Sequence, residues 1–216
     1  MNNFLDTTFA SFDYTILHAI HKFAKFTDEG LNGFFKYFSF LAEKGIILIL
    51  IAIILMLFKK TRKIGICMFG AIGLGAIITN LWLKDVVARI RPYNANHSFF
   101  QWWIYAGNVI EKDFSFPSGH TTAAMASMMA IFLNTNKKYS WTAFIFTFMI
   151  AFSRLYLVVH YPTDIIAGLI IGALAGIVAH FITIGIYLLF DKFNNNKVCE
   201  FIQEFDIRDI IFKFKK

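Results

Sequence analysis

Five consecutive residues, Phe116-Pro117-Ser118-Gly119-His120, place a hydroxyl group, a bare backbone amide and an imidazole side by side in a largely apolar chain. The order Pro-Ser-Gly suits a turn that leads into a helix. Glycine lets a ligand approach the main chain closely, and a helix N-terminus directs its unpaired N–H groups toward an anion. His120 would then stand beside that anion, ready to give up a proton. A helix cap followed by a half-buried histidine explains the same five residues equally well.

A second polar cluster, residues 84–92, precedes this turn and is rich in positive charge. Lys84 and Arg91 are seven residues apart, so on a helix they would share one face. An arginine offers a planar fork of donors that suits phosphate, and a lysine offers a point charge. The alternative is a basic anchor at the membrane surface. We expect the neighbouring Arg89 to lie at the surface.

The third cluster contains Arg154, His160 and Asp164. Arg154 falls within an apolar run, where a charge is costly and usually faces a cavity or a partner. His160 and Asp164 are four residues apart, so the carboxylate could orient one ring nitrogen and leave the other as a nucleophile. A buried His–Asp hydrogen bond that ties two helices together is an equally good interpretation.

The composition of the chain indicates a helix bundle in lipid. Of its 216 residues, 57% are hydrophobic and 16% charged, the mean hydropathy is +0.58, and phenylalanine occurs 27 times. The net charge is +7, but Lys and Arg gather at the ends of apolar runs, which favours contact with anionic headgroups over a nucleic-acid partner. The two cysteines give neither a disulfide framework nor a metal-ligand spacing. We therefore expect an all-α, polytopic membrane protein.

The apolar pattern predicts about six membrane helices and three regions. Residues 1–44 form an N-terminal region whose amphipathic helix, at 4–26, either lies at the interface or joins the bundle. Residues 45–190 form the transmembrane core, and residues 191–216 form a tail. The first span needs part of the preceding segment to reach the ~20 residues that cross a bilayer, with a bend at Gly45. The apolar runs of the core are residues 46–58, 64–83, 121–133, 139–159 and 165–190.

The basic loops predict the side of the membrane on which each segment lies. Segments 59–63 and 137–138 and the tail carry clustered lysines, so we expect them in the cytoplasm of a plasma or inner membrane protein. Because helices alternate sides, the polar stretches 84–118 and 160–164 must then share the external face. The reactive groups of the three clusters are therefore expected on one side of the membrane.

Together the three clusters supply three cationic side chains, a turn with free amides, two histidines and one carboxylate. Such a set suits phosphoryl transfer without a metal, because cations stabilise the equatorial oxygens while one histidine attacks in line and the other protonates the leaving oxygen. The sequence shows no acidic cluster near these motifs, and Mg²⁺ would need several carboxylates. We expect no metal and no cofactor.

The three motifs, Lys84-x6-Arg91-Pro, Pro-Ser-Gly-His120 and Ser-Arg154-x5-His160-x3-Asp164, resemble those of the type 2 phosphatidic acid phosphatase (PAP2) family. That family includes bacterial lipid phosphatases, glucose-6-phosphatase and the vanadium haloperoxidases. The similarity covers roughly residues 64–190 and includes all three motifs. It implies six membrane helices and an external active site.

The resemblance also implies roles for individual residues. His160 corresponds to a nucleophile that forms a phosphohistidine, Asp164 to its orienting partner, and His120 to the general acid for the leaving group. The remaining matched residues correspond to a phosphate cradle: Lys84, Arg91, Arg154, Ser118 and the Gly119 amide. Ser153 matches the motif without a role that the residues define.

These features predict an integral-membrane lipid phosphatase that acts on a membrane lipid phosphate. Undecaprenyl diphosphate is the first candidate substrate, followed by phosphatidylglycerophosphate or phosphatidate, and this order rests on the resemblance. One alternative is a phosphotransferase in which a hydroxyl group resolves the same intermediate. Another is a non-catalytic protein that binds or transports lipid headgroups. The oligomeric state is left open.

Overall fold

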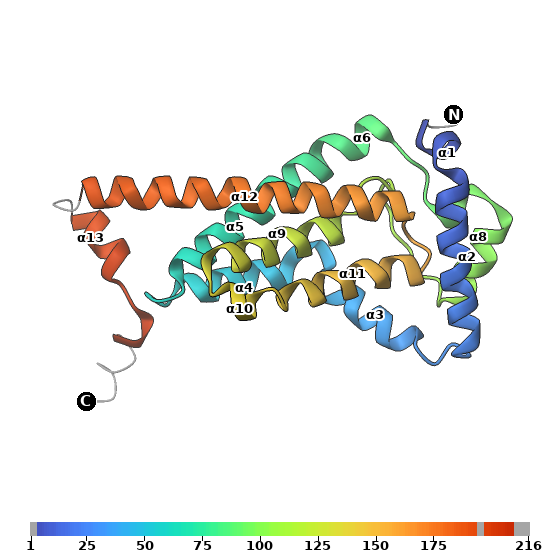
Figure 1. The fold of residues 1–216 in the computed structure, drawn as a ribbon, viewed down its shortest axis with the longest axis horizontal. Coiled ribbons are helices and arrows are strands. Elements are labelled where there is room, and N and C mark those ends of the chain that lie inside the picture. The colour runs from blue at the N-terminus through green and yellow to red at the C-terminus, as the bar shows by residue number, and fades with distance from the viewer. Residues whose placement is uncertain (1–3, 194–196, 210–216) are drawn as a thin grey trace.

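The computed structural model describes residues 4–193 and 197–209, and every regular element within them is a helix, as predicted. Long helices run side by side and α2 crosses them at one end (Figure 1). The bundle helices are α4 (Ile46–Met56), α5 (Arg62–Ile78), α9 (Gly119–Asn134), α11 (Ala143–Tyr156) and α12 (Pro162–Lys192). The other elements are α1 (Phe4–Thr8), α2 (Ala10–Phe26), α3 (Asn32–Leu41), η1 (Glu43–Gly45), a π-helical turn η2 (Thr79–Leu83), α6 (Lys84–Val87), α7 (Pro92–Ala95), α8 (His97–Tyr105), α10 (Lys137–Ser140) and α13 (Lys197–Glu204).

The centre of the bundle is the packing of α12 along α9 and α5. Helices in lipid attract one another mainly through close contact, which small residues allow. Gly172 of α12 shows how close the contact is: a Cβ atom there would lie 2.6 Å from the carbonyl oxygen of Thr122 on α9. Alanines dominate the surrounding core, and those buried in it are Ala52, Ala71, Ala126, Ala130, Ala175 and Ala179.

Two helical stretches of the described chain are long and apolar enough to cross a membrane, residues 62–95 and α12. The pair α3 and α4, bent by 48° at η1, makes a third if it forms one span. The bend expected at Gly45 is therefore confirmed, and Gly45 has φ = +69° there. Helices α9 and α11 lie in the same bundle but have only 16 and 14 residues. The count of six spans stays a prediction.

One face of helix α2 is buried against the bundle and carries two polar side chains. The residues of α2 that are buried against the bundle are Asp13, Leu17, His21 and Ala24, whereas its large aromatic residues, such as Phe12 and Phe23, are exposed. His21 stacks on Trp102 with ring centroids 4.9 Å apart. Burial, with help from Lys25 and His18, lowers the pKa of His21 to about 4, so this imidazole is neutral. The amphipathic helix thus presents its aromatic face outward.

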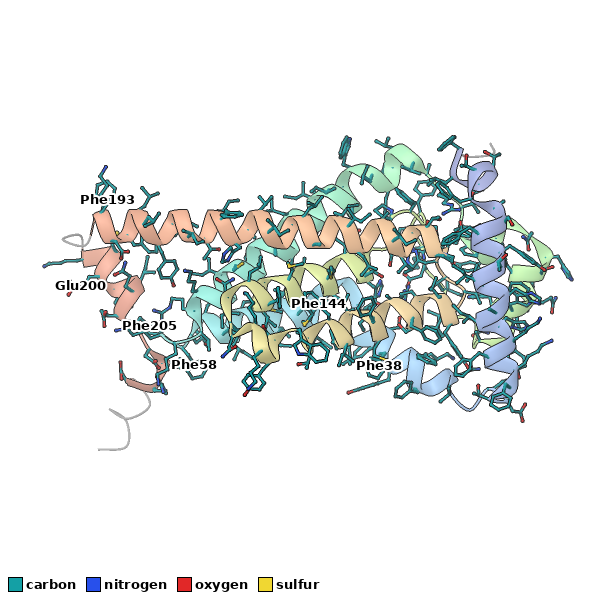
Figure 2. The ribbon with its side chains drawn as sticks, viewed as in Figure 1. Phe38, Phe58, Phe144, Phe193, Glu200 and Phe205 are labelled. Carbon is teal, nitrogen blue, oxygen red and sulfur yellow. The ribbon has the colours of Figure 1, made fainter. Side chains whose placement is uncertain are left out.

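The predicted grouping of the loops at two ends of the bundle is seen in Figure 1, where α6, α8 and the start of α12 lie at one end and α10 and α13 toward the other. Helix α13 and the chain after it contact the α4–α5 turn, at the end of the bundle where Figure 2 labels Phe58, Phe193 and Phe205. Ile207 N donates to the Leu57 carbonyl (3.0 Å). Arg62 donates to three carbonyl groups of this segment. Residues 194–196 and 210–216 of the predicted tail lie outside the described residues. The division at residues 44 and 191 stays a prediction.

Candidate active site

Residues of all three motifs surround one cavity of about 440 Å³ at the end of the bundle that α2 crosses. The imidazoles of His120 and His160, which are 40 residues apart in the sequence, both line it. The polar side chains of the motifs that line it are Lys84, Arg91, His120 and His160. The floor of the cavity is apolar and includes Ile72, Ala76 and Ala123. The cavity can therefore accept a polar headgroup together with part of an apolar chain.

His160 is held between a carboxylate and a guanidinium. Its Nδ1 lies 3.4 Å from Asp164 Oδ2, and its Nε2 lies 3.3 Å from Arg91 Nη1. Because a guanidinium can only donate, Nε2 must accept, so the ring proton is on Nδ1 and faces Asp164. Burial lowers the pKa of His160 well below its ordinary value, and the charges of Arg91 and Arg154 lower it further. A neutral imidazole with its lone pair on Nε2 is the form that can act as a nucleophile, once Arg91 turns from Nε2 to a bound phosphate.

Asp164 is fixed by several donors. Its Oδ2 accepts from the Tyr161 backbone N–H (2.9 Å) and from the Ser115 hydroxyl group (2.5 Å). The Tyr161 bond belongs to the first turn of α12, where helix N–H groups lack partners within the helix. The carboxylate has no solvent exposure. Its position relative to His160 is therefore set by the start of the helix.

Lys84 and Arg91 converge, but not on one helix face as expected. Helix α6 ends at Val87, and Arg91 is in an extended conformation before Pro92, because a residue that precedes proline is disfavoured in a helix. Both side chains instead meet at the carboxylate of Asp113, at 2.5 Å from Lys84 Nζ and 2.5 Å from Arg91 Nη2. Burial would raise the pKa of Asp113, but the two cations outweigh burial and hold the pKa below its ordinary value. The Asp113 carboxylate thus lies between two cations that would suit a phosphate group.

Arg154 lies behind the cavity wall and does not line it. It is fully buried, and its guanidinium pairs with Ser39 of α3 and with Glu111, which does line the cavity. The Nε group of Arg154 is buried without a hydrogen-bond partner. A guanidinium with a spare donor beside the cavity can reach an anion if Glu111 moves.

The Pro-Ser-Gly-His turn begins α9, as predicted. Ser118 is the N-cap residue: its hydroxyl group accepts from Thr121 N (3.4 Å), and its own N–H donates to the Asp164 carbonyl (3.1 Å). Ser118 is buried and does not line the cavity. Gly119 does line it, and a Cβ atom there would lie 2.9 Å from Asn80 Oδ1 of η2. A larger residue at this position would therefore have to displace the Asn80 side chain.

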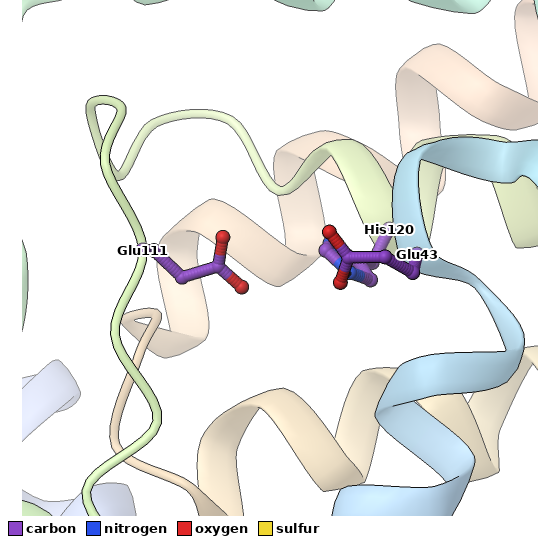
Figure 3. A group of neighbouring side chains, drawn as sticks. All are labelled: Glu43, Glu111 and His120. Atoms are coloured by element: carbon purple, nitrogen blue, oxygen red, sulfur yellow. The ribbon is translucent and has the colours of Figure 1, made fainter.

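His120 faces carboxylates from two other elements (Figure 3). Its Nε2 lies 3.2 Å from Glu43 Oε2 of η1, and one ligand atom each of Glu43, Glu111 and His120 lie within 4.8 Å of one another. Such a set could hold a divalent cation, although Glu111 is already paired with Arg154. The expected lack of acidic groups does not hold in space, because Glu43, Glu111 and Asp113 come from segments outside the motifs.

Arg89 was expected at the surface, and the structure contradicts this. It is 1% exposed and pairs with three carboxylates. The reason is that Asp6 and Asp13 of the N-terminal helices face it, together with Asp164. The signal in the sequence was the spacing of seven residues between these two acids, which places them on one side of a helix.

Residues 64–185, which contain all three motifs, match the sequence profile of the PAP2 superfamily. The chain belongs to this superfamily.

Relatives of this PAP2 protein include two undecaprenyl-diphosphatases. The first, from Sulfolobus acidocaldarius, is 32% identical over 144 residues, which are 66% of this chain and 66% of the relative. The second, undecaprenyl-diphosphatase BcrC from Bacillus subtilis, is 30% identical over 164 residues, which are 76% of this chain and 80% of the relative. The chain thus matches slightly less than two thirds of the first relative's length.

A solved structure has a similar fold. The transmembrane PAP2-type phosphatidylglycerolphosphate phosphatase from Bacillus subtilis superposes with a TM-score of 0.58 at 26% identity, and the match covers 77% of this chain and 83% of that one. The likeness extends beyond the profile match, so this PAP2 protein is a transmembrane helix bundle of the same kind.

Proposed function

We propose that this PAP2 protein is an integral-membrane lipid phosphatase that works through a phosphohistidine and needs no metal. The observation that supports this most strongly is the arrangement of His160, with Asp164 at Nδ1 and a cationic group at Nε2, in a cavity that His120 also lines. A protein that only binds headgroups has no use for a neutral nucleophile with an orienting carboxylate. This arrangement therefore favours catalysis over the binding alternative.

The chemistry follows from the positions of the two imidazoles. His160 Nε2 attacks phosphorus while the bond to the leaving oxygen breaks, and His120 donates a proton to that oxygen. The His160 ring then carries a positive charge, which Asp164 stabilises through Nδ1–H. Water next attacks phosphorus and gives a proton to His120, while the P–N bond breaks and its electron pair returns to Nε2. Both histidines thus end in their starting states.

The cradle for the transferred phosphoryl group combines Lys84 and Arg91 with Arg154 and the Gly119 amide. In the structure carboxylates hold the three cations, Asp113 the first two and Glu111 the third. A phosphate dianion would take over these contacts, and its geometry suits the arginine fork better than a single carboxylate does. Ser118 contributes indirectly, because it caps the helix that presents the amide.

Undecaprenyl diphosphate is the substrate that we propose first. Two relatives bear the name of that activity, and the similar solved structure bears the name of a phosphatidylglycerolphosphate phosphatase. The cavity supports a lipid of either kind, because its apolar floor adjoins its cationic wall. Phosphatidylglycerophosphate and phosphatidate remain the next candidates.

We also propose that the site faces the outside of the cell membrane. The basic turns at residues 59–63 and 137–138 lie away from the site, and basic loops are retained in the cytoplasm. The tail would then be cytoplasmic. Labelling of single cysteines introduced at Lys60 and Lys112, with a reagent that does not cross membranes, tests this: Lys112→Cys should react in intact cells and Lys60→Cys should not.

The test of the activity is phosphate release by the purified protein. We expect release from undecaprenyl diphosphate, phosphatidylglycerophosphate or phosphatidate that is unchanged by EDTA and that His160→Ala reduces by at least ~10³-fold. His97→Ala is the matched control, because His97 is an exposed histidine outside the cavity. Turnover by His160→Ala at the rate of the control would refute the assigned nucleophile, and loss of turnover in EDTA would refute metal independence.

A further inference from the structure

Arg89 joins the N-terminal helices to the carboxylate behind His160. All three of its nitrogen atoms donate to a carboxylate: Nε to Asp6 Oδ1 (2.8 Å), Nη2 to Asp13 Oδ2 (2.8 Å) and Nη1 to Asp164 Oδ1 (2.7 Å). The guanidinium also lies over the Tyr161 ring, 3.8 Å from its centroid. One planar cation therefore fixes three acids from three elements in one arrangement.

Asp13 has a second connection to the start of α12. Its Oδ1 accepts from Thr163 N (3.0 Å), and its Oδ2 accepts from the Thr163 hydroxyl group (2.8 Å). That hydroxyl group accepts in turn from Arg89 Nη1 (2.7 Å). Thr163 immediately precedes Asp164, so α2 contacts the catalytic end of α12 both through the backbone and through the guanidinium.

The residues of this network are buried, and burial determines how strongly their charges act on one another. Asp13, Arg89 and Asp164 are each no more than 1% exposed. Charges at such a depth are weakly screened, and an unpaired one is strongly disfavoured. Arg89 favours the anionic form of Asp164 next to His160, together with the Ser115 hydroxyl group and the Tyr161 N–H. Asp13 and Asp6 in turn offset the positive charge of Arg89. A network that served only to hold helices together would not need to include the carboxylate that orients His160.

From this geometry we infer that Asp13 and Arg89 are positioning residues of the reaction, which hold Asp164 ionised and directed at His160 Nδ1. The inference rests on the proposed function, because it concerns the same nucleophile. It makes the N-terminal helix α2, which precedes all three motifs, part of the catalytic machinery. Neither residue touches the reacting phosphorus, and both act through Asp164.

The charge on the intermediate explains why such residues would affect kcat. When His160 Nε2 becomes bonded to phosphorus, the ring gains positive charge, and Asp164 stabilises it through Nδ1–H. Removal of the Asp13 charge leaves Asp6 as the other carboxylate that offsets Arg89, so the surroundings of Asp164 become more positive and the charged His160 ring is stabilised less. Substrate binding depends on Lys84 and Arg91 and is untouched. The expected signature is a fall in kcat at constant KM.

Asp13→Asn is the decisive variant, because the amide keeps the size of the side chain and can still accept from Thr163. We expect kcat to fall about tenfold and KM to change by less than about twofold, in line with the loss of other orienting partners. Asp28→Asn is the matched control, since Asp28 is exposed in the turn after α2 and asparagine tolerates its φ of +44°. Asp6→Asn removes a partly exposed partner of Arg89, and we expect a fall in kcat of about threefold.

A double-variant cycle separates positioning from general loosening. In an Asp164→Asn background there is no carboxylate for Arg89 to balance, so Asp13→Asn should lower kcat no further. The inference is overturned if Asp13→Asn matches Asp28→Asn, or if the tenfold loss persists in the Asp164→Asn background. If Asp13→Asn does not fold, Asp6→Asn in the same cycle decides, and an unchanged kcat there overturns it. The proposed function fails separately, through a His160→Ala variant that retains turnover.

Discussion

The two halves of the bundle bury different kinds of side chain. At the end crossed by α2, buried charges are concentrated, among them Lys84, Arg89, Arg91, Arg154 and Asp164. Around the middle of α5, α9 and α12, the buried side chains are mostly alanine, with methionine, isoleucine and one free cysteine, Cys67. The first half combines paired charges with a core of large side chains such as Phe99, Trp102 and Tyr156, whereas the second is held in place by close packing of small residues.

This difference separates the part of the bundle that fixes the geometry of the site from the part whose close packing adds stability. Paired buried charges fix positions at the cost of desolvation, so they specify geometry more than they add stability. Close packing of helices adds stability and is intolerant of added volume. We therefore expect changes in the packed half to alter stability while leaving the chemistry intact. At the charged end we expect changes to alter the chemistry directly, with an added cost in stability wherever a buried charge loses its partner.

The largest expected effect tests the packed half. Gly172→Ala places a Cβ atom 2.6 Å from the Thr122 carbonyl oxygen and 2.7 Å from Met125 Cβ, which should destabilise the protein by about 1–3 kcal/mol. The matched control is Gly73→Ala, where no atom lies within 4 Å of the added Cβ and alanine favours the helix. Thermal inactivation midpoints in detergent measure the difference. Equal midpoints would show that the two helices do not pack as closely as described.

A smaller effect is expected at the charged end. Asp113→Asn removes the carboxylate that pairs with Lys84 and Arg91, so inorganic phosphate no longer competes with it. We expect the inhibition constant for phosphate to fall roughly threefold, the size expected for a half-exposed ion pair. Asp85→Asn, an exposed acid next to Lys84, serves as the control for a general change of charge. Weaker phosphate inhibition in Asp113→Asn would mean that the carboxylate helps to bind phosphate rather than competing with it.

The smallest expected effect is that of pH on kcat/KM, which should be nearly constant. The pKa of His160 is lowered, so its neutral form persists as the pH falls and is lost only below that lowered value. The test uses an aryl phosphate, whose leaving group needs no proton from His120, and corrects kcat/KM for the ionisation of the phosphate itself, whose second pKa is about 6. The corrected kcat/KM should change less than about twofold between about pH 7.5 and pH 5.5. A decline centred near the ordinary pKa of histidine would show that the charged surroundings do not act on His160 as described.

The motifs predicted several of the side chains that line the cavity, because the residues of each motif are close together in the sequence. The four-residue spacing of His160 and Asp164 and the turn before His120 are set within one helical turn, and apolar periodicity then brings the ends of the helices together. The structure confirms that both histidines line the cavity with Lys84 and Arg91. Their catalytic roles remain predictions.

Sequence reasoning failed where partners are far apart in the chain. Arg89 meets Asp13 across 76 positions, and His120 meets Glu43 across 77. No periodicity encodes such pairs, because each side chain alone resembles an ordinary surface charge. The burial of Asp13 on a helix rich in phenylalanine has the same origin, since its partner Arg89 is distant in the sequence.

The π-helical turn η2 determines where a single-residue deletion can be tolerated without moving Lys84 away from the cavity. A turn of this kind holds one residue more than an α-helical turn, whereas each residue of a regular helix rotates the next one by about 100°. Deletion of one residue within 79–83 would restore regular winding and leave Lys84 aimed at the cavity, with only the contact of Asn80 against Gly119 altered. Deletion of one residue within α5 would instead swing Lys84 toward lipid. Tolerance to single-residue deletions should therefore be confined to a five-residue window in this span.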